Sequence, residues 1–314
     1  MAVISRADAA ALLNTQDINE ILQEAPKSSV ALSTFRTIRM SSTVAKMPVL
    51  SALPTAGFVS DDTENSSSTK PTSKVEWEDK FLNVEEIAVI VPIHENVFDD
   101  ASYDIWAEVR PLIAQEFGRV LDGAVLFGTN KPSTWDASLE DGARTAGNVI
   151  DYSTVVGAGG DLAEAVNQTM GLVEADGFDV NQFYAKRTLR ARLRGLRDDV
   201  GQPIYLDNIR SDGNTPTIYG EPIAWVTNGA WVSPTGGPPA TSGADLIAGD
   251  RTKAILGVRQ DMTFKLLDQA TVGGYNLAEK DMIALRCKMR VAFAVANPLT
   301  PEASGGYPFA ILSD

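Results

Sequence analysis

The chain has 314 residues, 44% of them hydrophobic, which is enough to bury one large core or two modest ones and argues against a disordered chain. Its 41 acidic and 27 basic residues give a net charge of −14, and this negative field repels phosphate, which argues against a protein that reads nucleic-acid sequence. A single cysteine excludes an intrachain disulfide framework, and with only one histidine present a His/Cys metal site is not expected.

The first 45 residues predict one or two short helices followed by an extended arm. Residues 2–25 carry apolar side chains at helical spacing, and Pro26 ends that pattern. Residues 27–45 alternate loosely between apolar and polar side chains, which is typical of an extended segment. The N-terminus lacks the features of a signal peptide, and no apolar run reaches the roughly 18 to 20 residues of a membrane span. We therefore expect a protein that stays where it is made and has no membrane association.

Residues 60–93 predict a polar loop tip and a pair of long charged strands. Residues 60–73 are almost entirely polar and cannot offset the entropy of ordering by burying apolar surface. Composition favours equally a loop tip between pairing strands and an insertion of no consequence. Residues 75–93 read as strands, because the apolar side chains of the second run share one face at period two: Ile87, Val89, Val91 and Ile93.

A long helix is predicted directly behind these strands, over 103–125. Its apolar residues form one stripe, at positions 105, 109, 112, 113, 117, 120, 121 and 124. Pro111 lies inside the pattern, so either the helix kinks there or a short turn precedes a helix that begins near Arg110. A polar hairpin joined to a long helix has no obvious catalytic pocket and suggests a part that reaches toward a neighbour.

The rest of the chain predicts a second α/β region and a closing block of strands. Residues 129–160 are rich in Gly, Asn, Thr, Asp and Pro and mark the boundary. The expected elements are a helix over 161–176, strands over 179–185, 203–206 and 222–226, a basic helix over 188–198, and strands over 254–258, 262–267 and 281–295. In the last strand, residues 283–295 alternate apolar side chains with Arg286, Lys288 and Arg290. One face of this strand should therefore be buried in the core, and the other should be exposed to solvent or lie in an interface.

Catalytic chemistry has weak support in this sequence. The Gly157-Ala158-Gly159-Gly160 run lacks the preceding buried strand of a phosphate loop and favours a boundary turn. His94 could act as a base, but an isolated histidine at a strand end is more often structural. Cys287 lies on the apolar face of its strand, where a thiol stays protonated. We therefore predict no enzyme activity, no cofactor and no bound metal.

Two charged features also favour structural roles. Adjacent aspartates point to opposite faces of a strand and suit caps or solvated turns; these pairs are Asp61-Asp62, Asp99-Asp100 and Asp198-Asp199. The basic residues between Lys186 and Arg197 spread around their helix, which favours a solvated helix, or a bridge to acidic patches on neighbouring copies, over a nucleic-acid site.

The order of these parts resembles the major capsid proteins of tailed bacteriophages, whose shell has the Hong Kong 97-type fold. The first match runs from the arm through Met47-Pro48-Val49-Leu50 and residues 86–93 to Leu126-Phe127-Gly128. A second match covers residues 193–204 and Tyr219-Gly220-Glu221-Pro222-Ile223, and a third covers residues 255–295 with Pro308-Phe309-Ala310. Together these matches extend over nearly the whole chain.

The resemblance implies an α+β capsid fold with six consecutive parts. They are an N-terminal arm (1–45), an extended β-hairpin loop (46–93), a peripheral domain with a long spine helix (94–150), an axial domain (151–253), peripheral-domain strands (254–298) and a C-terminal return to the axial domain (299–314).

The resemblance also implies a function. The chain would be a structural protein that self-assembles into hexamers and pentamers of an icosahedral head and encloses double-stranded DNA without sequence-specific binding. Its other partners would be a portal and, in addition, either separate scaffolding or decoration proteins or no further protein. It would be assembled in the cytoplasm of the bacterial host and would reside in the virion. The acidic balance would keep packaged DNA from adhering to the inner wall.

In some members of that family a loop lysine is joined to an asparagine by an isopeptide bond, aided by a glutamate. The resemblance makes Lys70, Lys74, Lys80 and Asn297 the candidates for such a cross-link. The chemistry needs a desolvated, deprotonated amine, and these lysines lie in or beside a very polar segment, which argues against it.

Two other functions remain open from sequence. A shell of the encapsulin type shares the fold but encloses cargo enzymes in place of DNA. A soluble α/β enzyme that uses scattered carboxylates belongs to a different class, and it would be a monomer or small oligomer with a defined pocket.

Overall fold

The computed structural model describes residues 29–54, 56, 72–100, 105–197, 202, 217–231, 243–303 and 305–313. Several predicted features lie outside these residues: the one or two helices over 2–25, most of the polar segment 60–73, the strand over 203–206, Lys70, Asp61-Asp62 and Asp198-Asp199. The described helices are α1 (Val30–Thr34), α2 (Glu95–Asp100), α3 (Ile105–Phe127), α4 (Leu139–Ala146), α5 (Tyr152–Gly157), α6 (Leu162–Ala175) and α7 (Leu189–Gly195).

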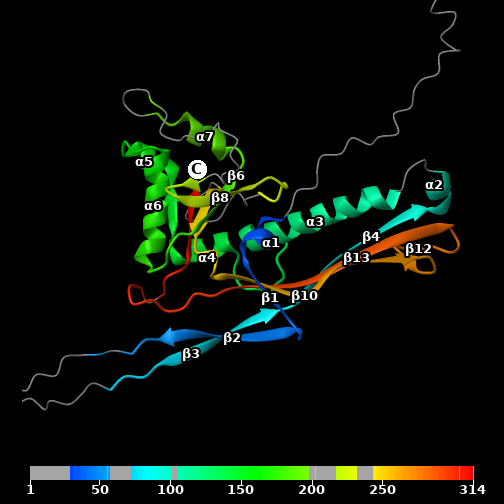
Figure 1. Cartoon of the computed structure of the whole chain (residues 1–314), viewed down its shortest axis with the longest axis horizontal. Coiled ribbons are helices and arrows are strands. Elements are labelled where there is room, and N and C mark those ends of the chain that lie inside the picture. The colour runs from blue at the N-terminus through cyan, green and yellow to red at the C-terminus, as the bar shows by residue number, and fades with distance from the viewer. Residues whose placement is uncertain are drawn as a thin grey trace, which may run out of the picture.

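The described strands fall into two large sheets and two small ones, so the fold is α+β as predicted (Figure 1). The four-stranded sheet has the order β1 (Arg36–Arg39), β10 (Ala254–Leu267), β13 (Met282–Val295) and β4 (Glu85–His94). The six-stranded sheet has the order β5 (Val149–Asp151), β14 (Phe309–Ser313), β9 (Ala244–Gly249), β6 (Gln182–Lys186), β8 (Glu221–Val226) and β7 (Thr217–Ile218). The two-stranded sheets pair β2 (Val44–Ala52) with β3 (Glu76–Asn83) and β11 (Thr271–Val272) with β12 (Tyr275–Asn276).

The four-stranded sheet packs one face against α3. Strand β13 has the predicted alternation: Leu285, Cys287 and Met289 are buried, and Arg286 and Lys288 on the other face are partly exposed. The buried row joins Ile113, Phe117 and Leu121 of α3 in one apolar core. Burial of this shared face is the main stabilising term for both elements.

Helix α3 runs unbroken through Pro111, so the alternative of a helix that begins near Arg110 is wrong. Proline removes one backbone donor, but the apolar stripe continues on both sides of it and packs on the sheet, which holds the helix together. The helix ends at Phe127, and the next residue, Gly128, has a positive φ of 71°, which suits glycine.

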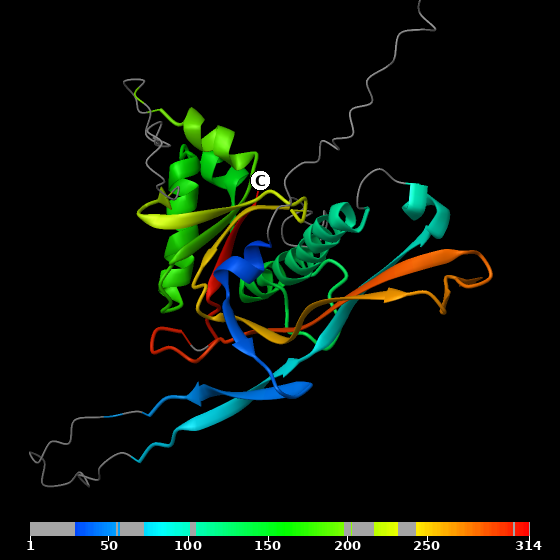
Figure 2. The same cartoon turned by 45° about the vertical axis from the view of Figure 1, so that its right-hand side comes forward.

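The predicted pairing within 75–93 is wrong. Strand β3 pairs with β2, whereas β4 pairs with β13 in the four-stranded sheet. Only Val84 separates β3 from β4, and a hairpin turn needs at least about two residues, so the chain continues from one sheet into the next. The projecting hairpin therefore consists of β2 and β3 (Figure 2), and residues 85–93 lie outside it.

Residues 27–45 are also less extended than predicted. Ser29 caps a short helix, α1, by accepting a hydrogen bond from the Leu32 amide at 3.1 Å. Strand β1 then pairs in parallel with β10. The two strands predicted over 254–258 and 262–267 are one strand, β10, with register shifts near Gln260.

Helices cover both faces of the six-stranded sheet. The buried side chains of α5, α6 and α7 pack against Phe183, Leu246 and Leu312 on one face, and Tyr184, Ile247 and Ile311 on the other face join the core around α3 and α4. The predicted helix over 161–176 is confirmed as α6, and the predicted strands over 179–185 and 222–226 are confirmed as β6 and β8.

The boundary segment 129–160 contains α4, β5 and α5, which were not predicted. Gly142 lies inside α4, where the Tyr307 ring packs so closely that a Cβ at this position would lie 2.2 Å from it. Ser138 caps this helix. The tertiary contact thus explains why a glycine stands inside a helix.

Candidate assembly surfaces

The hairpin presents large apolar side chains to solvent. The register of β2 and β3 places the side chains of Val44, Pro48, Trp77 and Phe81 on one side, together with the ion pair of Lys46 and Asp79, and we call this side the outer hairpin face. Trp77 is 67% exposed and Phe81 is 52% exposed. On the other side, Ala45, Met47 and Leu82 pack against the four-stranded sheet. Large aromatic side chains left in water on a projecting element are typical of an interaction surface.

Contacts hold the hairpin against the body both at its base and farther along β2. At the base, the Asn83 amide donates to the Thr134 carbonyl at 2.9 Å, and the Trp135 indole donates to the Asn83 carbonyl at 3.0 Å. Near the other end of β2, where Leu50 lies opposite Trp77, the Leu299 backbone N–H donates to the Leu50 carbonyl at 3.0 Å. The hairpin is therefore held along its length on one side while it extends away from the body (Figure 1).

The far end of the four-stranded sheet exposes a second apolar region. Phe264 and Leu266 lie on the α3 side of β10, and Leu266 is 52% exposed. Arg110 covers the Phe264 ring at 5.9 Å from its centroid, and Leu112 of α3 is also exposed. These residues offer a second surface suited to contact with another chain.

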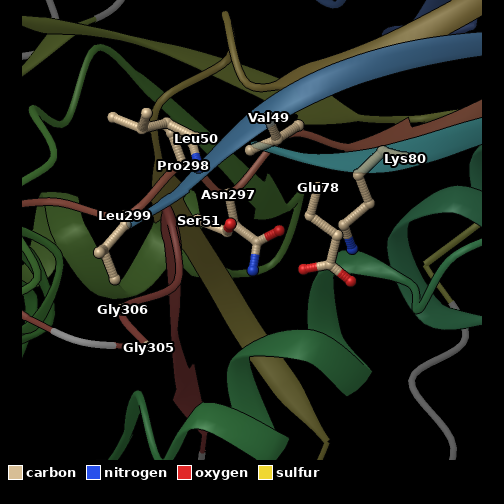
Figure 3. Close-up of a pocket in the computed structure, with 10 residues that line it drawn as sticks. All are labelled: Val49, Leu50, Ser51, Glu78, Lys80, Asn297, Pro298, Leu299, Gly305 and Gly306. Carbon is tan, nitrogen blue, oxygen red and sulfur yellow. The ribbon is translucent and has the colours of Figure 1, made fainter. Parts of the chain in front are cut away.

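The structure brings two of the four cross-link candidates together within one subunit. Lys80 and Asn297 both line a cavity of about 230 Å³ between the hairpin and the segment after β13. Figure 3 shows their side chains and that of Glu78 pointing into this space. The Lys80 ammonium lies 3.1 Å from an Asp136 carboxylate oxygen, and Lys74 pairs with Glu76 at the surface. A cross-link from Lys80 would require it to leave this ion pair.

The other sequence candidates do not form a reactive site. His94 is exposed where β4 ends, Cys287 is buried in the core, and the Gly157–Gly160 run forms the turn where α5 ends. Within the residues that the structure describes, no three His, Cys, Asp or Glu side chains are grouped so that they could hold a metal ion. No described helix is both long and apolar enough to span a membrane.

Comparison with known proteins explains why a hairpin projects from the body, why apolar side chains are exposed and why no reactive site forms among the described residues. The model of the phage capsid family matches residues 9–300. The chain belongs to that family. The major capsid protein of Staphylococcus phage 80alpha is 24% identical over 287 residues, which is 88% of this chain and 79% of that protein.

Solved structures of phage proteins share the whole fold. A chain from Microbacterium phage Oxtober96 is 53% identical, with a TM-score of 0.86 and 99% of each chain covered. A chain from Mycobacterium phage Bobi is 36% identical, with a TM-score of 0.84 and the same coverage. A capsid chain of an empty GTA particle, at 14% identity and a TM-score of 0.64, shares the fold alone. The architecture is therefore the Hong Kong 97-like capsid fold that the sequence resembles.

Membership in the phage capsid family gives the chain a structural function. It is a major capsid protein, a component of the virion that forms a shell with copies of itself. These matches do not favour an encapsulin-type compartment or a soluble enzyme.

Sequence reasoning missed one residue that organises this capsid subunit, Asp122 of α3. Its carboxylate accepts hydrogen bonds from Ser29 Oγ at 2.5 Å, from the amides of Val30 and Ala31 at 2.9 Å each, and from Asn228 Nδ2 at 2.6 Å. Burial raises the pKa of this carboxyl, and the hydrogen bonds oppose that shift. The signal in the sequence was a single carboxylate in the otherwise apolar run 120–127. Asp122 joins the arm, the long helix and the segment after β8.

The thiol of Cys287 should not react with a maleimide in the folded capsid subunit. Burial in the core keeps the reagent from the sulfur, and it also raises the pKa of this thiol, so that little of the reactive thiolate is present. Because the chain has one cysteine, mass spectrometry after timed labelling reads this site alone. Labelling should begin only when denaturant unfolds the subunit. Prompt labelling of the native protein would contradict the buried position of β13.

Proposed function

We propose that the chain assembles into hexamers and pentamers that close an icosahedral phage head around double-stranded DNA. The observation that carries the proposal is the outer hairpin face, where Trp77 and Phe81 project from the body into solvent. Within a shell of identical subunits, a second copy is the partner that every such face meets. The exposed region around Leu266 is a further surface available to a neighbour.

The parts of the subunit take the roles that the family resemblance suggests. The β2–β3 hairpin is the extended loop, α3 is the spine helix, and the four-stranded sheet is the peripheral domain that carries it. The six-stranded sheet with α5, α6 and α7 is the axial domain, and β14 is the C-terminal return to it. The pairing of β14 with β5 and β9 supports this last assignment.

The remaining partners follow from the same role. A net charge of −14 suits a wall that encloses DNA without binding its sequence, because like charges repel. A portal would serve DNA entry, and scaffolding or decoration proteins would be further partners of the chain. Assembly would take place in the cytoplasm of the bacterial host.

Virions that contain this chain test the proposal. They should protect double-stranded DNA from nuclease, and cryo-electron microscopy should resolve five-fold and six-fold capsomers of this subunit. Particles that enclose protein cargo and no DNA would contradict the proposal and favour a compartment shell.

Lys80 and Asn297 act as non-covalent contacts in this proposal, because Asp136 already holds the Lys80 ammonium. Boiled, reduced particles should therefore run as one band at the monomer mass of 33.6 kDa on a denaturing gel. A ladder of multiples would establish a cross-link between subunits. An intact mass that lacks one ammonia would establish an isopeptide bond within the subunit.

A further inference from the structure

Charge is sharply divided within the six-stranded sheet and its helices. Residues 149–182 contain six acidic residues and no basic one, namely Asp151, Asp161, Glu164, Glu174, Asp176 and Asp179. Residues 183–197 contain six basic residues and no acidic one, namely Lys186, Arg187, Arg190, Arg192, Arg194 and Arg197. Such blocks repel themselves and attract each other, so their placement in the fold matters.

Helix α6 and its N-cap carry three residues of the acidic block on the exposed side of the helix. Leu162, Ala165 and Val173 are buried against the sheet, and this leaves the opposite side in water. We call Asp161, Glu164 and Glu174, which are all exposed, the acidic face of α6. Asp161 caps the helix, and Glu164 accepts a hydrogen bond from Gln168 at 2.9 Å. Among the described residues, no lysine or arginine forms an ion pair with these three carboxylates.

Helix α7 presents a basic surface in the same way. Leu189 and Leu193 anchor it in the core, and Arg192 turns back to Asp245 at 2.6 Å. Arg187 just before the helix, Arg194 within it and Arg197 just after it are exposed, and we call these three the basic face of α7. Within the part of the chain that the structure describes, Arg194 and Arg197 donate to backbone carbonyls, and no carboxylate pairs with any of the three.

The two faces belong to neighbouring helices on the same side of one sheet. Helix α6 packs over β5, β14 and β9, α7 packs over β6, and the two helices also contact each other. The hydroxyl of Tyr219, in the turn between β7 and β8, donates to the Ala163 carbonyl near the acidic end of α6. Figure 2 shows both helices on the same side of that sheet. One subunit thus carries an acidic surface and a basic surface on neighbouring helices.

We propose that the acidic face of α6 in one copy docks against the basic face of α7 in the next copy around a capsomer. This inference rests on the proposed ring assembly and names its contact. In a ring each subunit meets its two neighbours through two different surfaces, and those surfaces must complement each other. Single exposed ion pairs contribute little, but opposed charged faces set the orientation of docking and exclude like-with-like pairing.

Two charge-reversed chains test the contact. Glu164→Lys with Glu174→Lys makes both sides basic, and Arg194→Glu with Arg197→Glu makes both sides acidic. Each variant alone should form capsomers at least about tenfold less than the wild type in sedimentation at low salt. All four substitutions in one chain should restore assembly. An equal mixture of the two variants should form rings that alternate, so six-membered rings should appear without five-membered ones.

The circular dichroism spectrum and the melting temperature of each unassembled variant establish that it is folded before its capsomer formation is measured. If the wild type assembles and the reversed variants assemble equally well, the α6–α7 contact is wrong while the proposed function stands. A folded fourfold variant that does not assemble, or a mixture that stays unassembled, also overturns the contact. Failure of the wild type to form any capsomer would instead count against the proposed function.

Discussion

Replacing Asp122 with alanine should lower the free energy of unfolding of the capsid subunit by about 3 to 5 kcal/mol. The substitution leaves four donors without their acceptor, and Ser29 and Asn228 among them are themselves buried. Urea denaturation of the unassembled subunit, followed by circular dichroism, measures the change.

Glu116→Ala is the matched control for this measurement. Glu116 lies on the same helix and is exposed, and its ion-pair partner among the described residues is Arg119, at the surface. Its replacement should change stability by no more than about 0.5 kcal/mol. Equal effects of the two substitutions would show that the Asp122 hydrogen bonds do not hold the arm to α3.

Replacing Trp77 and Phe81 together with serine should abolish shell formation and leave the subunit folded. Both side chains are more than half exposed, so their loss removes little intrachain packing. In an interface, aromatic side chains of this kind contribute about 2 kcal/mol or more each, and the loss is repeated at every copy of the contact. Electron microscopy of the purified variant, together with its melting temperature, separates the two effects.

Glu76→Ser provides the control on the same strand. Glu76 and Trp77 are neighbours on β3 and therefore point to opposite sides of the hairpin. The control variant should assemble as the wild type does. If the Trp77 and Phe81 variant also forms normal shells, the outer hairpin face is not an assembly surface.

Elements with a strong local pattern were predictable from sequence. The alternation of β13 and the cap and stripe of α6 are direct consequences of periodicity and of Asp161. The order of the parts was enough to identify the capsid fold. Local patterns failed where a partner decides the outcome: β4 has the same appearance whether it pairs with β3 or with β13.

The surfaces were only partly predictable for the same reason. The hairpin was expected to reach for a neighbour, but its outer face depends on which side of β3 packs against the sheet through Leu82. Asp122 contacts Ser29, 93 positions away in sequence, and Asn228, 106 positions away. Contacts between residues so far apart leave no local pattern in the sequence. From sequence, Asp122 is therefore only an unexplained carboxylate in an apolar run, and its partners cannot be predicted.

Copies of this chain cover the surfaces that a single subunit leaves exposed. Sedimentation of the purified chain over a range of concentrations should therefore detect species of capsomer or shell size in equilibrium with, or in place of, the 33.6 kDa monomer. A folded monomer that persists at the highest concentrations, with Trp77 and Phe81 still exposed, would contradict this prediction.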